Sequence, residues 1–244
     1  MASIFITGSA DGLGHLAAKA LIARGHRVVL HGRNQERGRE ALKKAPGAET
    51  VITGDLADPD EIIQLSKKVN ALGTFDAVIH NAGVYLAPAR ELFAVNTLAP
   101  YVLTCLLAKP DRIIYLSSGM HQGGTFREEA FETGSPGISY SDTKLHVLML
   151  CKAVARKWPE VYANAVDPGW VPTKMGGRGA PDDLEKGYRT QVWLAEGLDE
   201  KTKVSGRYFF HQKQRPSHPE ADDMQLQDSF LSACERITGI SLPD

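Results

Sequence analysis

The segment "SYSDTKLH" at residues 139–146 places a tyrosine four residues before a lysine. It is typical of the start of a helix, in which Tyr140 and Lys144 lie one turn apart on the same face. A free phenol titrates near pH ~10, too high for efficient proton exchange at neutral pH. A neighbouring ammonium group favours the phenolate and lowers that pKa. Two interpretations stay open on the spacing alone: an acid–base tyrosine tuned by the neighbouring lysine, or a chance pair of the kind that many helices carry.

A glycine-rich stretch, "TGSADGLG" at residues 7–14, lies between a predicted strand and a predicted helix. Gly8, Gly12 and Gly14 let the backbone approach a pyrophosphate, whose charge is stabilised by the helix N-terminus. The spacing is G-x3-G-x-G rather than the commoner G-x-G-x-x-G. A tight turn that is merely rich in glycine is the alternative, but the flanking elements favour dinucleotide binding.

The next predicted strand ends in "LHGRN", with Gly32 and Arg33 where an acidic residue would bind a free ribose 2′-hydroxyl. An arginine there favours the 2′-phosphate of NADP(H) over NAD(H); a solvated surface arginine is the alternative. Asp55, in "GDLAD", can accept from an adenine amino group or cap a helix. Asn81, in "HNAG", can bond to backbone across the sheet.

The elements that position these residues alternate along the chain. Predicted strands cover residues 3–7, 27–31, 49–53, 75–80, 111–117, 161–167 and 206–210, and predicted helices cover 12–25, 36–45, 58–72, 90–108, 139–157, 182–195 and 223–237. Strict alternation implies parallel strands, right-handed crossovers and helices on both faces. We therefore expect an α/β fold, with one doubly wound parallel sheet of about seven strands in a single domain over residues 1–244. Ligands bind such sheets beyond the C-terminal ends of the strands.

Composition excludes several other classes of protein. The 244 residues are 43% hydrophobic and 23% charged, and the net charge of −1 gives no reason to expect nucleic acid or an anionic membrane as partner. The three cysteines form no CxxC pair and the eight histidines show no ligand spacing, so neither a disulfide framework nor a metal site is expected. Without a membrane-length apolar stretch or a visible signal peptide, we expect a soluble protein in a reducing, cytoplasmic setting.

Taken together, the motifs TGSADGLG, GDL, HNAG, Asn96, LSS, YSDTK and DPGWVPT resemble, in this order, those of the short-chain dehydrogenase/reductase family. The resemblance covers nearly the whole chain. It implies a Rossmann-like single domain, a nicotinamide cofactor, and interconversion of an alcohol with a ketone or aldehyde. It implies catalytic roles for Asn96, Ser118, Tyr140 and Lys144, with Ser117 as the less favoured serine. It implies cofactor contacts at Gly8, Ser9, Asp11, Gly12, Leu13, Gly14, Arg33, Asp55, Leu56, Asn81, Ala82, Gly83, Tyr140, Lys144, Val171 and Thr173.

The roles implied by this resemblance agree with the chemistry of the side chains. Tyr140 exchanges a proton with the carbonyl or alcohol oxygen, and Ser118 holds the same oxygen by hydrogen bonding. Lys144 holds the ribose and, with the oxidised nicotinamide, lowers the pKa of Tyr140. Asn96 and a water link Lys144 to solvent. Val171 offers its backbone, and Thr173 its hydroxyl, to the carboxamide, while the cofactor supplies the hydride.

The chain departs from the family pattern in two segments that concern assembly. The segment over residues 84–94 and the helix over 96–110 are shorter than usual. Because these helices build the dimer interface in many members, we expect a monomer or a homodimer.

Two other segments concern the substrate. Residues 119–139 form a longer loop than usual, as in retinol-dehydrogenase-like members, and we expect it to be flexible. His121 in this loop is either a substrate contact or, as we favour, a solvated histidine. A glycine-rich substrate loop or lid is expected at about 170–195. The side chains that could line an apolar pocket for a lipophilic or aromatic carbonyl, or simply pack in the core, are Tyr85, Met120, Trp170 and Met175.

The sequence thus favours an NADP(H)-dependent oxidoreductase that interconverts a carbonyl and an alcohol. A non-catalytic, dinucleotide-binding redox sensor is the main alternative, but such proteins usually lose the tyrosine or the lysine. A nucleotide-sugar epimerase or dehydratase shares Tyr-x3-Lys. Those relatives have G-x2-G-x2-G loops and longer C-terminal domains, and both features argue against them here.

Overall fold

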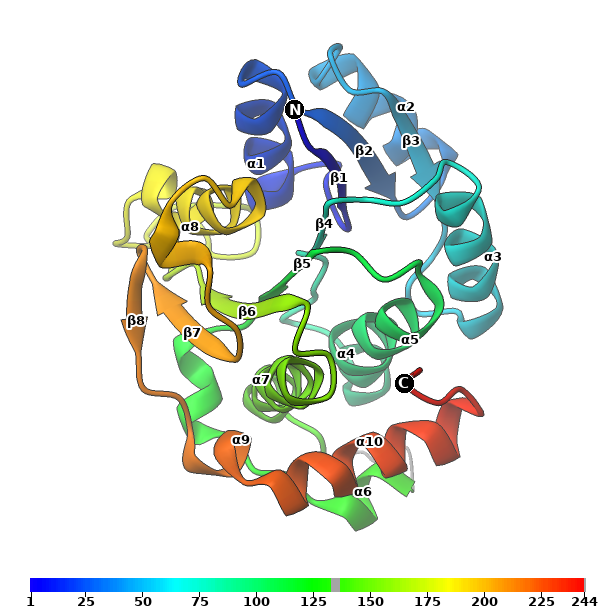
Figure 1. Ribbon diagram of the computed structural model, residues 1–244, viewed down its shortest axis with the longest axis vertical. Coiled ribbons are helices and arrows are strands. Elements are labelled where there is room, and N and C mark those ends of the chain that lie inside the picture. The colour runs from blue at the N-terminus through cyan, green and yellow to red at the C-terminus, as the bar shows by residue number, and fades with distance from the viewer. Residues whose placement is uncertain (133–136, 244) are drawn as a thin grey trace.

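The computed structural model describes residues 1–132 and 137–243, and it contains one eight-stranded sheet (Figure 1). Its strands are β1 (Ser3–Ile6), β2 (Arg27–Gly32), β3 (Thr50–Thr53), β4 (Ala77–His80), β5 (Arg112–Leu116), β6 (Tyr162–Asp167), β7 (Arg207–Phe210) and β8 (Lys213–Arg215). The spatial order is β3-β2-β1-β4-β5-β6-β7-β8, and only the β7–β8 pair among these is antiparallel. The order reverses between β1 and β4, which opens a ligand crevice at the carboxyl ends of these strands.

Helices cover both faces of the sheet, as the alternating pattern predicts (Figure 1). They are α1 (Gly12–Ala23), α2 (Gln35–Lys44), α3 (Pro59–Asn70), α4 (Ala89–Phe93), α5 (Ala99–Leu106), α6 (Glu128–Glu132), α7 (Tyr140–Lys157), α8 (Leu184–Glu196), α9 (Pro219–Asp222) and α10 (Met224–Thr238). Helices α1, α2 and α8 lie on one face, and α3, α4, α5 and α7 on the other. Helix α10 packs outside α7, against α7 and α6.

Successive residues of each strand enter opposite halves of the core. Phe5 of β1 packs with the side chains of α3, α5 and α7, whereas Ile4 and Ile6 pack with those of α1 and α8. This follows from the two-residue repeat of a strand, and burial on both faces explains why the strands read as continuous apolar runs. A sheet covered in this way holds its carboxyl ends, and the residues that follow them, at one edge.

The single helix expected over residues 90–108 is wrong in detail, because the chain forms α4, a π-helical turn over Ala94–Leu98 and then α5. Pro100 supplies the physical reason. It has no N–H to give to the Asn96 carbonyl four residues earlier, and its ring crowds that carbonyl in a regular α-helix. A π-turn absorbs the misfit and places Asn96 within it.

The expectation of about seven strands missed β8, a short and exposed strand. Its sequence, Lys-Gln-Arg, lacks the apolar alternation that identifies strands. The two-residue turn before it consists of His211 and Gln212, with φ of 48° and 61°. Positive φ at both central residues is the geometry of the favoured hairpin turns, but Gly, Asn or Asp normally occupies them. The turn therefore carries no sequence signal, and it is strained.

Relief of this strain gives the first testable prediction. Gln212→Gly is expected to raise the free energy of unfolding by about 0.5–1 kcal/mol, because glycine adopts positive φ without a side-chain clash. The backbone N–H of residue 212, which donates to Thr190 Oγ1 at 3.0 Å, is retained. Urea titration measures the change. Gln214→Gly, in β8 itself, is the matched control and should lower stability; a loss at both positions would contradict the idea of a strained turn.

The described parts of the long segment over residues 119–139 contain regular elements in addition to loop. The segment contains a 3-10 turn at Gly119–Gly123 and helix α6, while residues 133–136 lie outside the described part of the chain. His121 in this segment is fully buried, so the expectation of a solvated histidine is wrong. Its Nδ1 bonds to the Ser118 carbonyl at 2.6 Å, and its ring packs edge-on against Tyr208. His121 is a structural support behind Ser118.

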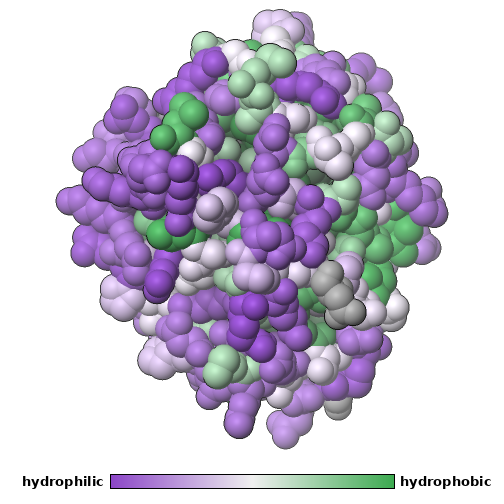
Figure 2. Space-filling view, in the orientation of Figure 1, coloured by the Kyte–Doolittle hydropathy of each residue, from purple (hydrophilic) through white to green (hydrophobic). Residues whose placement is uncertain are grey.

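The surface turned to the viewer is mostly hydrophilic, with smaller apolar areas between the polar side chains (Figure 2). Within residues 1–132 and 137–243, the search for a helix long and apolar enough to span a bilayer finds none. Helix α10 covers α7 within the chain itself. Whether the protein is a monomer or a homodimer stays a prediction.

Candidate active site

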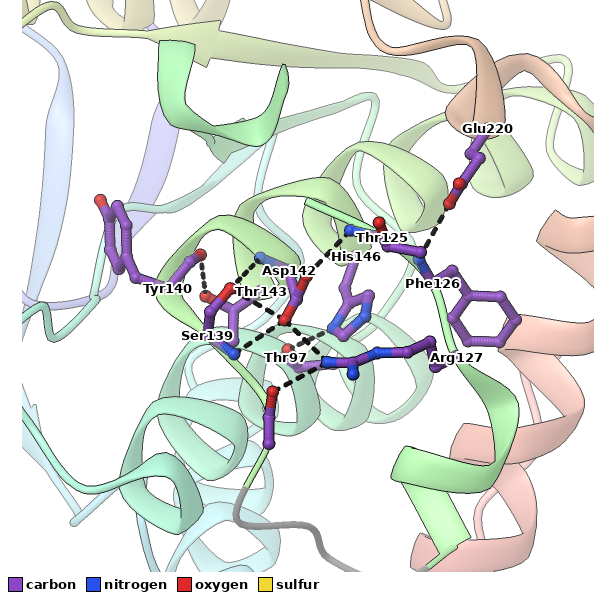
Figure 3. Close-up of polar contacts among 11 residues, drawn as sticks. Thr97, Thr125, Phe126, Arg127, Ser139, Tyr140, Asp142, Thr143, His146 and Glu220 are labelled. Carbon is purple, nitrogen blue, oxygen red and sulfur yellow. Dashed lines mark hydrogen bonds and ion pairs between the residues drawn. The ribbon is translucent and has the colours of Figure 1, made fainter. Parts of the chain in front are cut away.

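Tyr140 is the first residue of α7, and a network of hydrogen bonds fixes the start of that helix (Figure 3). Ser139 and Asp142 form a capping box, with Ser139 Oγ accepting from the Asp142 N–H at 3.1 Å. The 119–139 segment braces the same carboxylate, which accepts from the Thr125 N–H at 2.8 Å and lies 3.5 Å from the Arg127 guanidinium. The Tyr140 ring points away from this network (Figure 3). The helix start is therefore anchored on one side while the phenol is presented on the other.

Lys144 is buried one turn after Tyr140, as the spacing predicts. Its Nζ donates to the Leu116 carbonyl at 2.9 Å and lies 5.4 Å from the centre of the Tyr140 ring. Burial lowers the pKa of Lys144 to about 8, although the Asp167 carboxylate acts in the opposite direction. The pKa of the Lys144 ammonium therefore lies close to neutral pH. The side chain is hydrogen-bonded to backbone and also lines the cleft.

The two adjacent serines at the end of β5 point to different partners. Ser117 is buried and its Oγ donates to the Lys144 carbonyl at 2.9 Å. Ser118 Oγ accepts from the Met120 N–H at 3.2 Å, and the Ser118 side chain lies near enough to Tyr140 to lower the pKa of its phenol. This arrangement favours Ser118 as the serine that shares a substrate oxygen with Tyr140, and it gives Ser117 a structural role.

The groups of the protein alone shift the pKa of Tyr140 upward, opposite to the direction expected from Lys144. Burial is the largest cause and raises the pKa to about 12; the Ser118 hydrogen bond lowers it, while Asp167 and Tyr85 raise it further. The phenol is therefore held protonated by its surroundings. A positive charge bound next to the phenol would therefore be needed to favour the phenolate.

Asn96 lies in the π-turn, buried, with its side chain fully engaged. Its Oδ1 accepts from the Val84 N–H at 2.8 Å, and its Nδ2 donates to the Val84 carbonyl at 2.9 Å and to Thr143 Oγ1 at 3.2 Å. The side chain clamps the segment that follows β4 onto α7. Any link from Asn96 to Lys144 through water therefore falls to the main-chain carbonyl, which Pro100 deprives of its α-helical donor.

A cleft of about 370 Å³ lies at the crevice between β1 and β4 and collects most of the predicted cofactor residues. They are Gly8, Asp11, Gly12, Leu13, Arg33, Asp55, Leu56, Asn81, Ala82, Gly83, Tyr140, Lys144 and Thr173. Two close approaches fix the glycine loop. A Cβ on Gly8, at φ +62°, would lie 2.7 Å from Ala82 Cα, and one on Gly14 would lie 2.3 Å from Asn81 Nδ2. Asn81 Nδ2 donates to the Thr7 and Gly8 carbonyls, which is the predicted bond across the sheet.

Three predicted residues do not line this cleft. Ser9 is buried and bonds to the Ile6 carbonyl and the His31 N–H. Gly14 packs against Asn81, so its role is close helix–strand contact rather than contact with a ligand. Val171 lines the neighbouring cavity instead. For Asp55, the helix-cap alternative is wrong, because Asp58 caps α3 while Asp55 accepts from the Ala57 N–H.

Among the cleft residues that sequence reasoning missed, His31, Arg37 and Lys174 make polar contacts that shape the site. His31 joins the glycine loop to the end of β3, with Nδ1 accepting from the Gly8 N–H at 2.9 Å and Nε2 donating to the Gly54 carbonyl at 2.9 Å. Burial lowers the pKa of His31 to about 4, so the ring is neutral at pH 7. Arg37 and Lys174 both pair with Asp11. Partial burial raises the pKa of Asp11, but these two cations outweigh it and hold the pKa below its usual value.

A second cavity, of about 590 Å³, opens beside the first and shares Tyr140 with it. Ser118 also lines this second cavity, so both hydroxyls face it. Its outer wall contains large apolar side chains that are partly exposed, namely Tyr85, Met120, Trp170 and Met175. We call this space the substrate cavity. A glycine-lined cleft at the reversal of strand order and a largely apolar cavity that meet at Tyr140 are typical of a dinucleotide-dependent oxidoreductase.

Comparison with known proteins identifies the particular family. A protein-family model described as short chain dehydrogenase matches residues 2–183 of the sequence. The chain therefore belongs to this family of nicotinamide-dinucleotide oxidoreductases. Short-chain dehydrogenase chyC of Penicillium rubens is 43% identical over 258 residues, with 100% of both chains covered. An uncharacterized oxidoreductase of Emericella nidulans is 43% identical over 256 residues, covering 100% of this chain and 99% of that one. Among solved structures, a protein from Mycobacterium paratuberculosis superposes with a TM-score of 0.85 at 24% identity, covering 100% of this chain and 96% of that one.

Proposed function

We propose that this protein is an NADP(H)-dependent oxidoreductase that interconverts a ketone or aldehyde with an alcohol. The observation that carries the proposal is the pair of hydroxyls, Tyr140 and Ser118, facing one cavity with the Lys144 ammonium buried behind them. Two hydroxyls on one side of a cavity can hold a carbonyl oxygen, and a protonated phenol can give it a proton.

Each residue then has one task. Ser118 holds the substrate oxygen, and Tyr140 donates a proton to it during reduction or accepts one during oxidation. Lys144 holds the ribose and supplies positive charge next to the phenol. The Asn96 carbonyl, left without its helical donor, binds a water that connects Lys144 with solvent. When bound, the nicotinamide cofactor donates or accepts the hydride.

The protein groups around the cleft fit a phosphorylated dinucleotide. Gly8 packs closely on Ala82, so its backbone forms the bottom of the cleft. A Cβ atom built on Gly12 would have no neighbouring protein atom within 4 Å, which leaves space beside that residue. Beside the end of β2, where a 2′-hydroxyl would need an acid, the cleft presents Arg33 and Arg37. Two guanidinium groups favour a 2′-phosphate.

The preference for NADP(H) gives a second prediction. Arg33→Ala should weaken NADPH binding about tenfold to a hundredfold, since a hydrogen bond to a charged group is worth about 1.5–3 kcal/mol, and should leave NADH binding nearly unchanged. Calorimetric titration with each cofactor provides the dissociation constants. As the control, Arg39→Ala removes an exposed arginine of helix α2 that does not line the cleft. Equal losses for both cofactors, or NADH preference in the wild type, would show that Arg33 is only surface charge.

The substrate cavity supports a lipophilic or aromatic substrate. Its size suits a molecule larger than a simple alcohol, and its outer wall is apolar. The lid is confined to residues 170–183, because residues 184–196 form α8, whose Thr190, Gln191 and Val192 are buried. Within the lid, the Trp170 indole N–H donates to the Gly176 carbonyl and Lys174 reaches Asp11 across the cofactor cleft. Opening of the lid would expose both cavities together.

A further inference from the structure

The inner wall of the substrate cavity is built by the carboxyl ends of β6 and β7. Asp167 and Phe210 are the last residues of these strands and are partners in the parallel register. Tyr208 lies two residues before Phe210 and therefore points to the same face of the sheet. Its hydroxyl donates to Asp167 Oδ2 at 3.0 Å, and the Gly169 N–H donates to Oδ1 at 2.8 Å. The carboxylate is thus held in one orientation at the cavity wall.

Aromatic side chains line the same cavity as this carboxylate. The Phe210 ring is supported by the His211 ring, stacked on it at 3.8 Å between centres and 24° between planes. The strained turn at His211–Gln212 is what brings these rings together, and such strain is typical of functional sites. Trp170, with 61% of its surface exposed, and Tyr85, packed edge-on against Tyr140, complete the aromatic lining.

The charged side chains of the cavity all have one sign. Among the described residues that line it, Asp167 and Asp182 are the carboxylates, and none is a lysine, arginine or histidine. Lys144 lies on the cofactor side of Tyr140, bonded to Leu116. His121 lies behind Ser118, and burial lowers its pKa. A substrate anion in this cavity would therefore meet two carboxylates, while the Lys144 ammonium, which interacts with Asp167, lies on the cofactor side of Tyr140.

We propose that the wall formed by Asp167 and Phe210 binds a basic nitrogen of the substrate, so that the substrate is an aromatic or lipophilic carbonyl compound that carries an ammonium group. A cation is attracted both by a carboxylate and by the face of an aromatic ring, and more strongly where water is partly excluded. This inference rests on the proposed function for the identity of the cavity as the substrate site.

Three acetophenones that differ only in the para substituent test the proposal: trimethylammonium, tert-butyl and carboxylate. The first two are nearly the same shape, so they separate charge from size. We expect wild-type kcat/KM for reduction by NADPH to fall in that order. In Asp167→Asn, the kcat/KM for the trimethylammonium ketone divided by that for the tert-butyl ketone should drop about tenfold. Comparing variant with wild type cancels the intrinsic reactivity of each ketone.

Asp60→Asn removes one exposed carboxylate of α3 and is the matched control, which should keep the wild-type ratio. If Asp167→Asn fails to fold, the wild-type affinities for the three unreactive probes described below decide, because binding does not depend on the intrinsic reactivity of a ketone. Wild-type preference for the carboxylate ketone, or equal use of all three, would overturn the proposal while leaving the proposed function intact.

A binding measurement tests recognition of the ammonium group without requiring catalytic turnover. Phenyltrimethylammonium, benzyl alcohol and benzoate are titrated against wild type and Trp170→Phe, following tryptophan fluorescence. Selective quenching by the cation, lost in Trp170→Phe and weakened in Asp167→Asn, supports the proposal even if no ketone is turned over; in that case the proposed function alone fails. Absence of any selectivity for the cation overturns the proposal.

Discussion

Tyr140→Phe is expected to lower turnover of any carbonyl substrate by about a thousandfold, while NADPH binding changes little. General acid–base catalysis contributes about 10²–10⁴ to a rate, and Tyr140 is the phenol that faces the substrate cavity with Ser118 and Lys144 beside it. Removal of the hydroxyl leaves the ring, the Lys144 hydrogen bond to Leu116 and the cofactor cleft in place. Loss of absorbance by the reduced nicotinamide measures turnover, and fluorescence titration measures cofactor affinity.

Tyr85→Phe is the matched control for this prediction. Its ring packs edge-on against Tyr140 at 4.8 Å, in the wall of the same cavity, so it tests loss of a neighbouring phenol without loss of the acid. It should retain most of the activity. If Tyr140→Phe keeps substantial turnover, the assignment of the acid is wrong. If the wild type binds NADPH tightly but reduces no member of a broad carbonyl panel, a redox-sensing role becomes the better explanation.

The pKa shifts of Tyr140 and Lys144 predict how the rates of reduction and oxidation depend on pH. The wild-type protein holds Tyr140 protonated, with a pKa of about 12, and holds Lys144 near a pKa of about 8. Reduction needs the phenol, which is present throughout the neutral range. Oxidation needs the phenolate, so its rate should rise with pH. Above the Lys144 pKa, loss of the ammonium removes charge that favours the phenolate.

The placement of many candidate site residues could be predicted because they are local in sequence. Tyr140 and Lys144 share one helix face, and the glycine loop joins one strand to one helix. Ser118 and Ser117 could not be told apart, since their partners come from different elements. Ser117 contacts a backbone carbonyl of α7, whereas Ser118 lies beside the phenol at the start of that helix.

Residues that reach the site from distant strands were missed. His31 contacts Gly8 and Gly54 only because β1, β2 and β3 are neighbours, and a histidine inside an apolar strand is the one signal that could have found it. Asp167 belongs to a motif that was recognised, yet its position on the cavity wall depends on Tyr208, 41 residues away. Such contacts depend on which strands are neighbours in the sheet, and the residue pattern within one strand does not show this.

The fold was predicted well where apolar periodicity is strong and poorly where it is weak. The seven parallel strands follow from apolar runs, whereas β8 is three polar residues after a turn with no glycine. The π-turn around Asn96 had a visible cause in Pro100, since a proline inside a helix removes one hydrogen bond. The lid and the substrate cavity depend on side-chain packing among several loops, and no single segment predicts that packing.

Ser118→Ala is expected to lower kcat by about a hundredfold, whereas Ser117→Ala should leave most of the activity. A single donor to a developing negative charge is typically worth about 10²–10³ in kcat, and Ser118 Oγ lies with the Tyr140 hydroxyl at the substrate cavity. Ser117 Oγ instead donates to the Lys144 carbonyl, so its loss should cost about 1 kcal/mol of stability. Steady-state kinetics and urea titration of both variants separate the two roles. A larger loss of kcat in Ser117→Ala, at unchanged stability, would reverse the assignment and place the other serine beside the substrate oxygen.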